Sequence, residues 1–132
     1  MCITLLTEVV ANSYTITTLA SFNGTNGSNP SGRLLRDSSG NLFGTTTSGG
    51  AKSDGAVLEV KANSNAITTL ASINGTNGSL PYGGLLEDSS GNLFGTTLYG
   101  GTNSDGTIFE VEAKRQSVVA EYSCWALNWP LS

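Results

Sequence analysis

Five carboxylates recur at matching positions along the chain and are the residues best suited to acid–base chemistry. Three glutamates stand 51 residues apart, and two aspartates share that spacing: Glu8, Glu59, Glu110, Asp54 and Asp105. Paired carboxylates serve as acid and base in glycoside hydrolysis. A catalytic pair is needed once, however, whereas a residue present in every copy of a repeat is explained more simply by a hydrogen bond within each copy. We therefore expect no catalytic residues and a protein that is not an enzyme.

Other catalytic and metal-binding arrangements lack their essential residues. The chain contains no histidine, which removes the commonest general base, the commonest metal ligand and any pairing of a nucleophile with an imidazole. Its two cysteines, Cys2 and Cys124, lack the spacing of a zinc site or of a redox motif. We expect free thiols at both positions and no metal site built on them.

Two identical Asp-Ser-Ser-Gly-Asn stretches, residues 37–41 and 88–92, resemble a calcium loop only superficially. The twelfth position of such a loop carries a bidentate glutamate, but here it is Ser48 or Tyr99. The glycine and asparagine instead favour the positive φ angles of a tight hairpin turn. We therefore expect hairpin turns capped by aspartate, and no metal or other cofactor.

The second copy of the repeat gains two aromatic residues that could bind a sugar. Two serines of the first copy are replaced by Tyr82 and Tyr99, beside Asn103 and Asp105. Aromatic faces next to amide and carboxylate groups are typical of carbohydrate-binding sites. The same tyrosines would also suit an interface between repeats or subunits. The four residues are therefore a candidate ligand-binding site, with interface packing as the alternative.

The composition excludes several classes of protein. Charged residues make up only 12% of the 132 residues, the net charge is −4, and the six Lys and Arg residues form no basic stripe. We therefore expect no nucleic-acid partner. No stretch approaches the roughly 18 apolar residues of a membrane span, and residues 1–6 are too short for a signal peptide. We expect no membrane partner, and the length suits one domain.

The chain is a tandem repeat with a period of 51 residues. Residues 37–46 recur at 88–97, and residues 20–28 recur at 71–79 with one change. A fixed period of this length is the signature of a repeat architecture. We divide the single domain, residues 1–132, into repeat 1 (5–55), repeat 2 (56–106), a partial third repeat (107–113) and a non-repeat apolar tail (114–132).

Each repeat contains four runs with strand character, separated by turn residues. Residues 84–87 and 93–97 predict one hairpin, residues 56–60 and 67–73 predict a second, and residues 99–106 form a glycine-rich loop. Four short antiparallel strands per repeat match a β-propeller blade, and the adjacent apolar residues in these strands fit burial on both faces. We expect an all-β fold of two four-stranded propeller blades, with a β-solenoid as the alternative.

The repeated motif Leu-x-x-Asp-x-x-Gly-Asn-Leu-Phe-Gly-Thr-Thr, at residues 34–46 and 85–97, is followed each time by Gly-Gly and then by Gly-x-x-Leu or Gly-x-x-Phe. At these residues the chain resembles the tandem GloVer-type repeat of bacterial surface proteins, a propeller-like, choice-of-anchor repeat family. The resemblance covers residues 5–113. It implies an extracellular or cell-surface array of many copies with a separate anchor, and it implies no catalytic residues. We expect neither a leader nor an anchor within this chain.

Two blades cannot close a propeller, because each blade needs a neighbour on both sides. We therefore expect a non-enzymatic binding scaffold that assembles with itself, most simply a closed homo-oligomeric ring in which three chains supply six blades. A carbohydrate-binding lectin of the two-blade oligomeric type, with glycans as partners, is the alternative function. The chain could instead be a piece of a longer array.

The two ends of the chain hold competing strand candidates. Residues 5–9 and 107–111 both match the third strand of a repeat, so a strand from one end could complete a blade begun elsewhere. The tail at residues 114–132 is too apolar for a solvated segment. We interpret it as a replacement fourth strand or an interface plug, with a disordered non-native extension as the alternative. Its aromatic residues are expected at the oligomer interface: Tyr122, Trp125 and Trp129.

Overall fold

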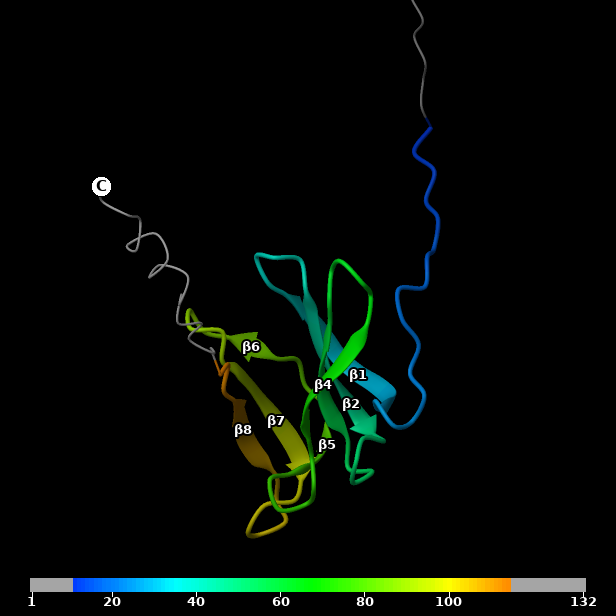
Figure 1. Ribbon diagram of the computed structural model, residues 1–132. Helices are drawn as coiled ribbons and strands as arrows, with labels where there is room; N and C mark the ends of the chain where they lie inside the picture. Colours follow the sequence, from blue (N-terminus) through cyan, green and yellow to red (C-terminus); the bar gives the residue numbers. More distant parts are fainter. Residues whose placement is uncertain (1–10, 115–132) are drawn as a thin grey trace, which may run out of the picture.

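The computed structural model describes residues 11–114, which form strands, turns and loops with no helix (Figure 1). The all-β prediction is therefore confirmed. Sheet I contains β1 (Ser28–Arg36), β2 (Leu42–Ser48), β3 (Ala56–Val60) and β4 (Ile67–Ser72). Sheet II contains β5 (Ser79–Pro81), β6 (Leu86–Glu87), β7 (Leu93–Tyr99) and β8 (Thr107–Val111).

Sheet I is an antiparallel meander in which strands that follow one another in the sequence lie side by side. In sheet II, β7 lies in the middle, with β8 on one side and both β5 and β6 on the other. Together β5 and β6 occupy the place of the single strand β1. The interruption between them contains Gly83 and Gly84, and consecutive glycines weaken a strand because they offer no side chain to pack.

One expected strand is missing from the described part of the chain. The sequence predicts that residues 5–19 form the third and fourth strands of a repeat, but residues 11–22 form no strand. Within residues 11–114 no partner strand lies beside them, and a single strand without ladder hydrogen bonds is unstable in water. Residues 1–10 and 115–132 lie outside the described residues, and with them the predictions on Cys2, Cys124 and Glu8 and those on Tyr122, Trp125 and Trp129.

The predicted aspartate-capped turns are present in both repeats. The Asp37 carboxylate accepts hydrogen bonds from the backbone N–H groups of Ser39 (2.9 Å) and Asn41 (2.8 Å) and from the Asn41 side-chain amide (2.8 Å). The Asn41 side-chain oxygen Oδ1 accepts a hydrogen bond from the Ala62 N–H at 3.2 Å, which joins this turn to the β3–β4 turn. Asp88 and Asn92 repeat the arrangement in sheet II. In both turns the aspartate carboxylate oxygens accept hydrogen bonds from N–H groups of the turn itself.

The Asn-Gly-Thr-Asn-Gly loops that precede each sheet also share one geometry. Asn23 and Asn26 each donate their backbone N–H to the other's side-chain oxygen, both at 3.0 Å. Asn74 and Asn77 make the same two bonds in the loop between β4 and β5. The two loops therefore enter their sheets in the same way.

The core lies between the two sheets. Phe43 and Val57 of sheet I pack against Leu93 of sheet II and form its buried centre. Gly95 leaves room for the ring of Phe109, because a Cβ atom at Gly95 would lie 2.5 Å from the ring's Cζ. The apolar residues surrounding this centre are partly buried: Leu35, Ala71, Leu85, Phe109 and Val111.

Candidate functional site

The two sheets contact each other through opposite faces. Sheet I contributes the positions of Leu35, Phe43, Val57 and Ala71, which we call the tail face. Sheet II contributes a different set, which we call the head face. Its members correspond, 51 residues earlier in the sequence, to residues that lie on the other side of sheet I. The head face consists of Leu85, Leu93, Phe109 and Val111 in sheet II and of Leu34, Leu42, Leu58 and Val60 in sheet I.

Among residues 11–114, this head-to-tail contact leaves the tail face of sheet II uncovered. Val57 in sheet I is fully buried, whereas its counterpart Ile108 is 83% exposed. Leu35 is partly buried in the core, whereas its counterpart Leu86 is 68% exposed. Apolar side chains gathered on one sheet face are unusual in a monomer and mark an interaction surface.

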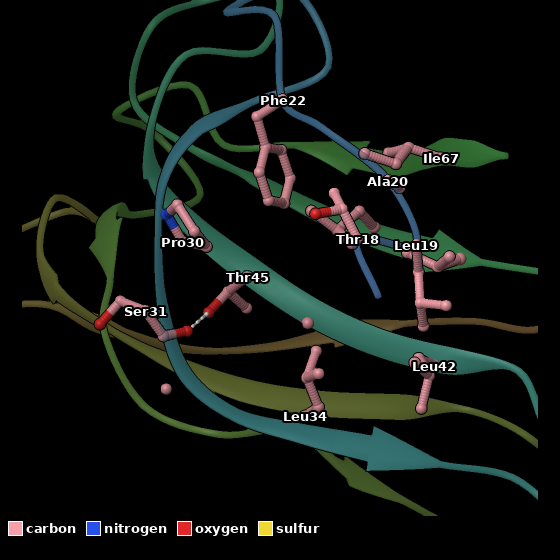
Figure 2. Close-up of a pocket in the computed structure, with 14 residues that line it drawn as sticks. Thr18, Leu19, Ala20, Phe22, Pro30, Ser31, Leu34, Leu42, Thr45 and Ile67 are labelled. Carbon is pink, nitrogen blue, oxygen red and sulfur yellow. Dashed lines mark hydrogen bonds between the residues drawn. The ribbon is translucent and has the colours of Figure 1, made fainter. Parts of the chain in front are cut away.

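The head face of sheet I meets no other sheet among residues 11–114, although Leu58 on this face is only 2% exposed, and the face holds a cavity of about 450 Å³. Leu34 is 63% exposed there. Figure 2 shows Leu34 and Leu42 on one side of this cavity, with the segment containing Thr18 and Phe22 passing over the other. Gly44 contributes to the hollow, since it stands where Gly95 accommodates the Phe109 ring in sheet II.

Polar and close contacts between the sheets add specificity to the apolar packing. Ser79 Oγ donates to the Asp54 carboxylate at 3.2 Å, and the Leu80 N–H donates to the Asp54 carbonyl at 3.3 Å. Ser31 Oγ donates to the Tyr82 carbonyl at 3.3 Å. These bonds set how one sheet sits on the other.

Both repeats of the structure thus carry the same sequence motif and the same set of turns. A family model for the Gloeobacter/Verrucomicrobia repeat matches residues 5–130. The chain belongs to this repeat family. The match extends beyond residue 113, so it includes most of the segment that sequence comparison between the two copies sets apart as a tail. Comparisons with curated proteins and with solved structures found no match.

In this Gloeobacter/Verrucomicrobia repeat, the residues that join the two sheets have counterparts 51 residues away that lie on the open faces. Pro81 packs on Gly55 in the structure. At the corresponding repeat positions, Pro30 replaces Pro81 and is exposed, and Gly106 replaces Gly55. The nearest atoms around a Cβ placed on Gly106 belong to its own sheet. Asp105, the counterpart of Asp54, is likewise exposed. Each open face therefore carries one half of a contact that the chain makes internally.

The four residues predicted as a ligand site come from two segments of sheet II, and none of them lines the cavity. Tyr99 ends β7, and Asn103 and Asp105 follow in the β7–β8 loop. Tyr82 lies just beyond Pro81 at the end of β5. Tyr82 and Tyr99 are 61% and 57% exposed, so both rings are accessible.

The repeated carboxylates have separate places in the structure. Glu59 lies opposite Phe43 and Thr68 within sheet I, Glu110 lies opposite Phe94 in sheet II, and Asp54 bonds Ser79. Within residues 11–114 no group of three or more His, Cys, Asp or Glu residues is placed to hold a metal ion. The same residues contain no helix long and apolar enough to cross a membrane.

Sequence reasoning predicts two unfinished faces but does not identify their residues. The alternation of side chains along a strand, with a period of two, separates Leu34 from Leu35 and Leu42 from Phe43. That signal could have divided the apolar pairs into head and tail faces. It could not have shown which face meets which.

Proposed function

We propose that this protein is a non-enzymatic repeat scaffold that assembles head to tail with copies of itself. The open tail face of one copy packs on the open head face of the next, as sheet I and sheet II pack within the chain. One observation carries the proposal: Val57 is fully buried by this packing, while Ile108 at the same position of the next repeat is 83% exposed. Covering such apolar surface favours association.

The polar residues of the two open faces support the same pairing. In the chain, Asp54 accepts a hydrogen bond from Ser79 and Gly55 accommodates Pro81. Between copies, the counterparts would bring Asp105 to Ser28 and Gly106 to Pro30. The side-chain chemistry of these pairs is unchanged, so the contact can repeat without new interactions.

Tyr82 fits this assembly as an interface residue. It stands where Ser31 stands in sheet I, and the Ser31 side chain reaches the backbone of the sheet packed against it. In the assembly Tyr82 would face the next copy's Ser31 in the same way. A tyrosine there adds apolar area and a hydroxyl group to the contact between copies.

Head-to-tail contacts close into a ring when the rotation between subunits permits it. Three copies would bring together six four-stranded sheets, a usual number for a β-propeller. The loops at residues 49–55, 73–78 and 100–106 lie at one end of the sheets (Figure 1) and would form one rim of the ring. That rim is the surface on which a scaffold of this kind would bind other molecules.

Light scattering on the full chain at micromolar concentrations tests the proposal. We expect the native chain to have the mass of a trimer. We expect the Ile108→Asp variant to have the mass of a monomer, because the substitution places a carboxylate in the contact. Tyr14→Asp is the matched control, because it adds the same charge at an exposed apolar residue outside both faces. A native chain that stays monomeric at all concentrations would overturn the proposal, and so would an Ile108→Asp variant that assembles normally.

Carbohydrate binding at Tyr99, Asn103 and Asp105 is the second candidate function, favoured by the exposed Tyr99 ring and by the exposed polar residues that follow it in the β7–β8 loop. Aromatic rings stack on the C–H faces of sugars, and amide or carboxylate groups bond the hydroxyls. A glycan array with the native chain and with Tyr99→Ala distinguishes the two. Binding lost in Tyr99→Ala, with the oligomer mass unchanged, would favour the lectin; no binding by the native chain would exclude it.

A further inference from the structure

We infer that residues 16–21 of one copy form a strand beside β8 in sheet II of the neighbouring copy, the counterpart of β4 in sheet I. The inference rests on the proposed head-to-tail assembly and adds a strand exchange to it. Its first support is identity: residues 16–21 read Ile-Thr-Thr-Leu-Ala-Ser, the same six residues as β4 (Ile67–Ser72). In sheet I that sequence forms the edge strand beside β3. The chain therefore carries a second copy of this strand that is not used within the described structure.

Sheet II has a place for such a strand. β8 pairs with β7 along one edge, and its other edge pairs with no strand among residues 11–114. Its counterpart β3 pairs with β4 at that edge. A free strand edge presents a row of unpaired N–H and C=O groups and is a template for another chain. The missing partner of β8 is thus a strand of the β4 type.

The connection between repeats shows where residues 16–21 should lie. Within the chain, β4 belongs to the sheet whose tail face covers the head face of the next sheet, and residues 73–78 join the two. Residues 22–27 form the same loop, with Asn23 and Asn26 bonded as Asn74 and Asn77 are. Residues 16–21 should therefore belong to whichever sheet covers the head face of sheet I. In the assembly that sheet is sheet II of the neighbouring copy.

The observed course of the N-terminal segment agrees with this. Residues 18–20 and Phe22 already line the cavity on the head face of sheet I (Figure 2). Ile73, which follows β4, is 2% exposed, and its counterpart Phe22 points into that cavity. Ile16, in contrast, is 98% exposed, and apolar residues of a strand gain stability when a partner sheet covers them.

The same chain cannot make this pairing. In Figure 1 residues 11–22 run along the outer side of sheet I, whereas β8 is the outer strand of sheet II on the opposite side of the molecule. Both sheets lie between the donor segment and the acceptor edge. The pairing therefore joins two copies.

The register follows from sheet I. There Val60 pairs with Ile67 and Glu59 with Thr68. Shifted by the repeat, the pairing places Val111 opposite Ile16 and Glu110 opposite Thr17. Directly opposed residues in antiparallel strands are close enough for a disulfide, whereas diagonal neighbours are about 7–8 Å apart.

Disulfide cross-linking in the full chain tests the inference, with Cys2→Ser and Cys124→Ser as the background. We expect Thr17→Cys with Glu110→Cys to give covalent oligomers on oxidation. Thr17→Cys with Glu112→Cys is the register control, because residue 112 is a diagonal neighbour of residue 17 in this register, and it should give at least tenfold less product. Glu59→Cys with Thr68→Cys is the positive control, since this pair is opposed within sheet I and should cross-link within one chain.

A second variant tests whether the strand contributes to assembly. Thr17→Pro with Thr18→Pro removes two consecutive N–H groups, of which at least one would face β8. We expect the apparent dissociation constant to rise at least tenfold, while Ala11→Pro with Asn12→Pro leaves it within twofold of the native value.

The outcomes separate the two proposals. A native chain that assembles through Ile108 but shows no cross-link between the Thr17→Cys and Glu110→Cys positions would overturn the strand exchange and keep the head-to-tail scaffold. An intrachain cross-link of Glu110→Cys with Val119→Cys would also overturn it, because residues 115–132 would then occupy the β8 edge. A monomeric native chain would overturn both.

Discussion

Pro81 packs directly on Gly55 across the contact between the two sheets. The side chain of Pro81 is fully buried, and a Cβ atom on Gly55 would lie 2.8 Å from Pro81 Cδ. Gly55 also has a φ angle of +105°, a conformation that residues other than glycine rarely adopt. One glycine therefore meets two requirements, a backbone conformation and a close approach between repeats.

The substitution Gly55→Ala should lower the free energy of unfolding. The added methyl group strains the backbone and meets Pro81, and overpacking of this kind costs about 1–3 kcal/mol. Gly106→Ala is the matched control, because Gly106 has a φ angle of +100° but no proline against it in the chain. Urea unfolding at low protein concentration should show the larger loss for Gly55→Ala. Equal losses would mean that Pro81 adds nothing to the effect.

Two equivalent threonines should respond differently to valine. Thr97 Oγ1 bonds the Tyr99 carbonyl and the Thr107 hydroxyl, both at 2.9 Å, and accepts the Thr107 N–H. Thr46 Oγ1 is buried with no hydrogen-bond partner among the described residues, because Ala56 replaces the second threonine. Thr97→Val should therefore cost about 1–3 kcal/mol, whereas Thr46→Val should leave stability unchanged or raise it. Thermal unfolding of both variants measures the difference. A larger loss for Thr46→Val would contradict this account.

Acid should weaken both aspartate-capped turns. For Asp37, desolvation acts to raise the pKa, but hydrogen bonds from Asn41, Ser39 and Gly40 together hold that pKa below its ordinary value of 3.8. For Asp88, the backbone and side-chain bonds from Asn92 lower the pKa.

A carboxyl whose pKa is lower in the folded state stabilises the fold above its unfolded pKa, and this contribution is lost as the pH falls through the folded value. Stability should thus decline from about pH 5 downward. Asp37→Asn with Asp88→Asn should flatten that decline when urea unfolding is repeated across the range. An unchanged pH profile in this double variant would show that other groups cause the decline.

The aromatic residues of the C-terminal segment remain a prediction from the sequence, since they lie outside the described residues. Trp125→Ala with Trp129→Ala should weaken self-association several-fold if these rings pack at the subunit contact, because large aromatic side chains dominate interface energies. Analytical ultracentrifugation measures the association constant. A constant equal to that of the native chain would place both tryptophans away from the contact.

Local features of this protein follow from its sequence alone. The 51-residue period, the hairpins and the aspartate-capped turns at residues 37–41 and 88–92 were all predictable, because short-range residue types set turn geometry. The break in the first strand of sheet II at Gly83 and Gly84 was visible as a glycine pair but was not predicted.

Tertiary structure decides what identical residues do. Ile16 and Ile67 begin the same six-residue sequence, yet only Ile67 lies in a strand, because only it has β3 beside it. Val57 and Ile108 are apolar residues at one repeat position, yet one is buried and the other exposed, because only Val57 has a sheet packed over it. Ladder pairing and burial depend on neighbours distant in the sequence, so local pattern cannot assign them.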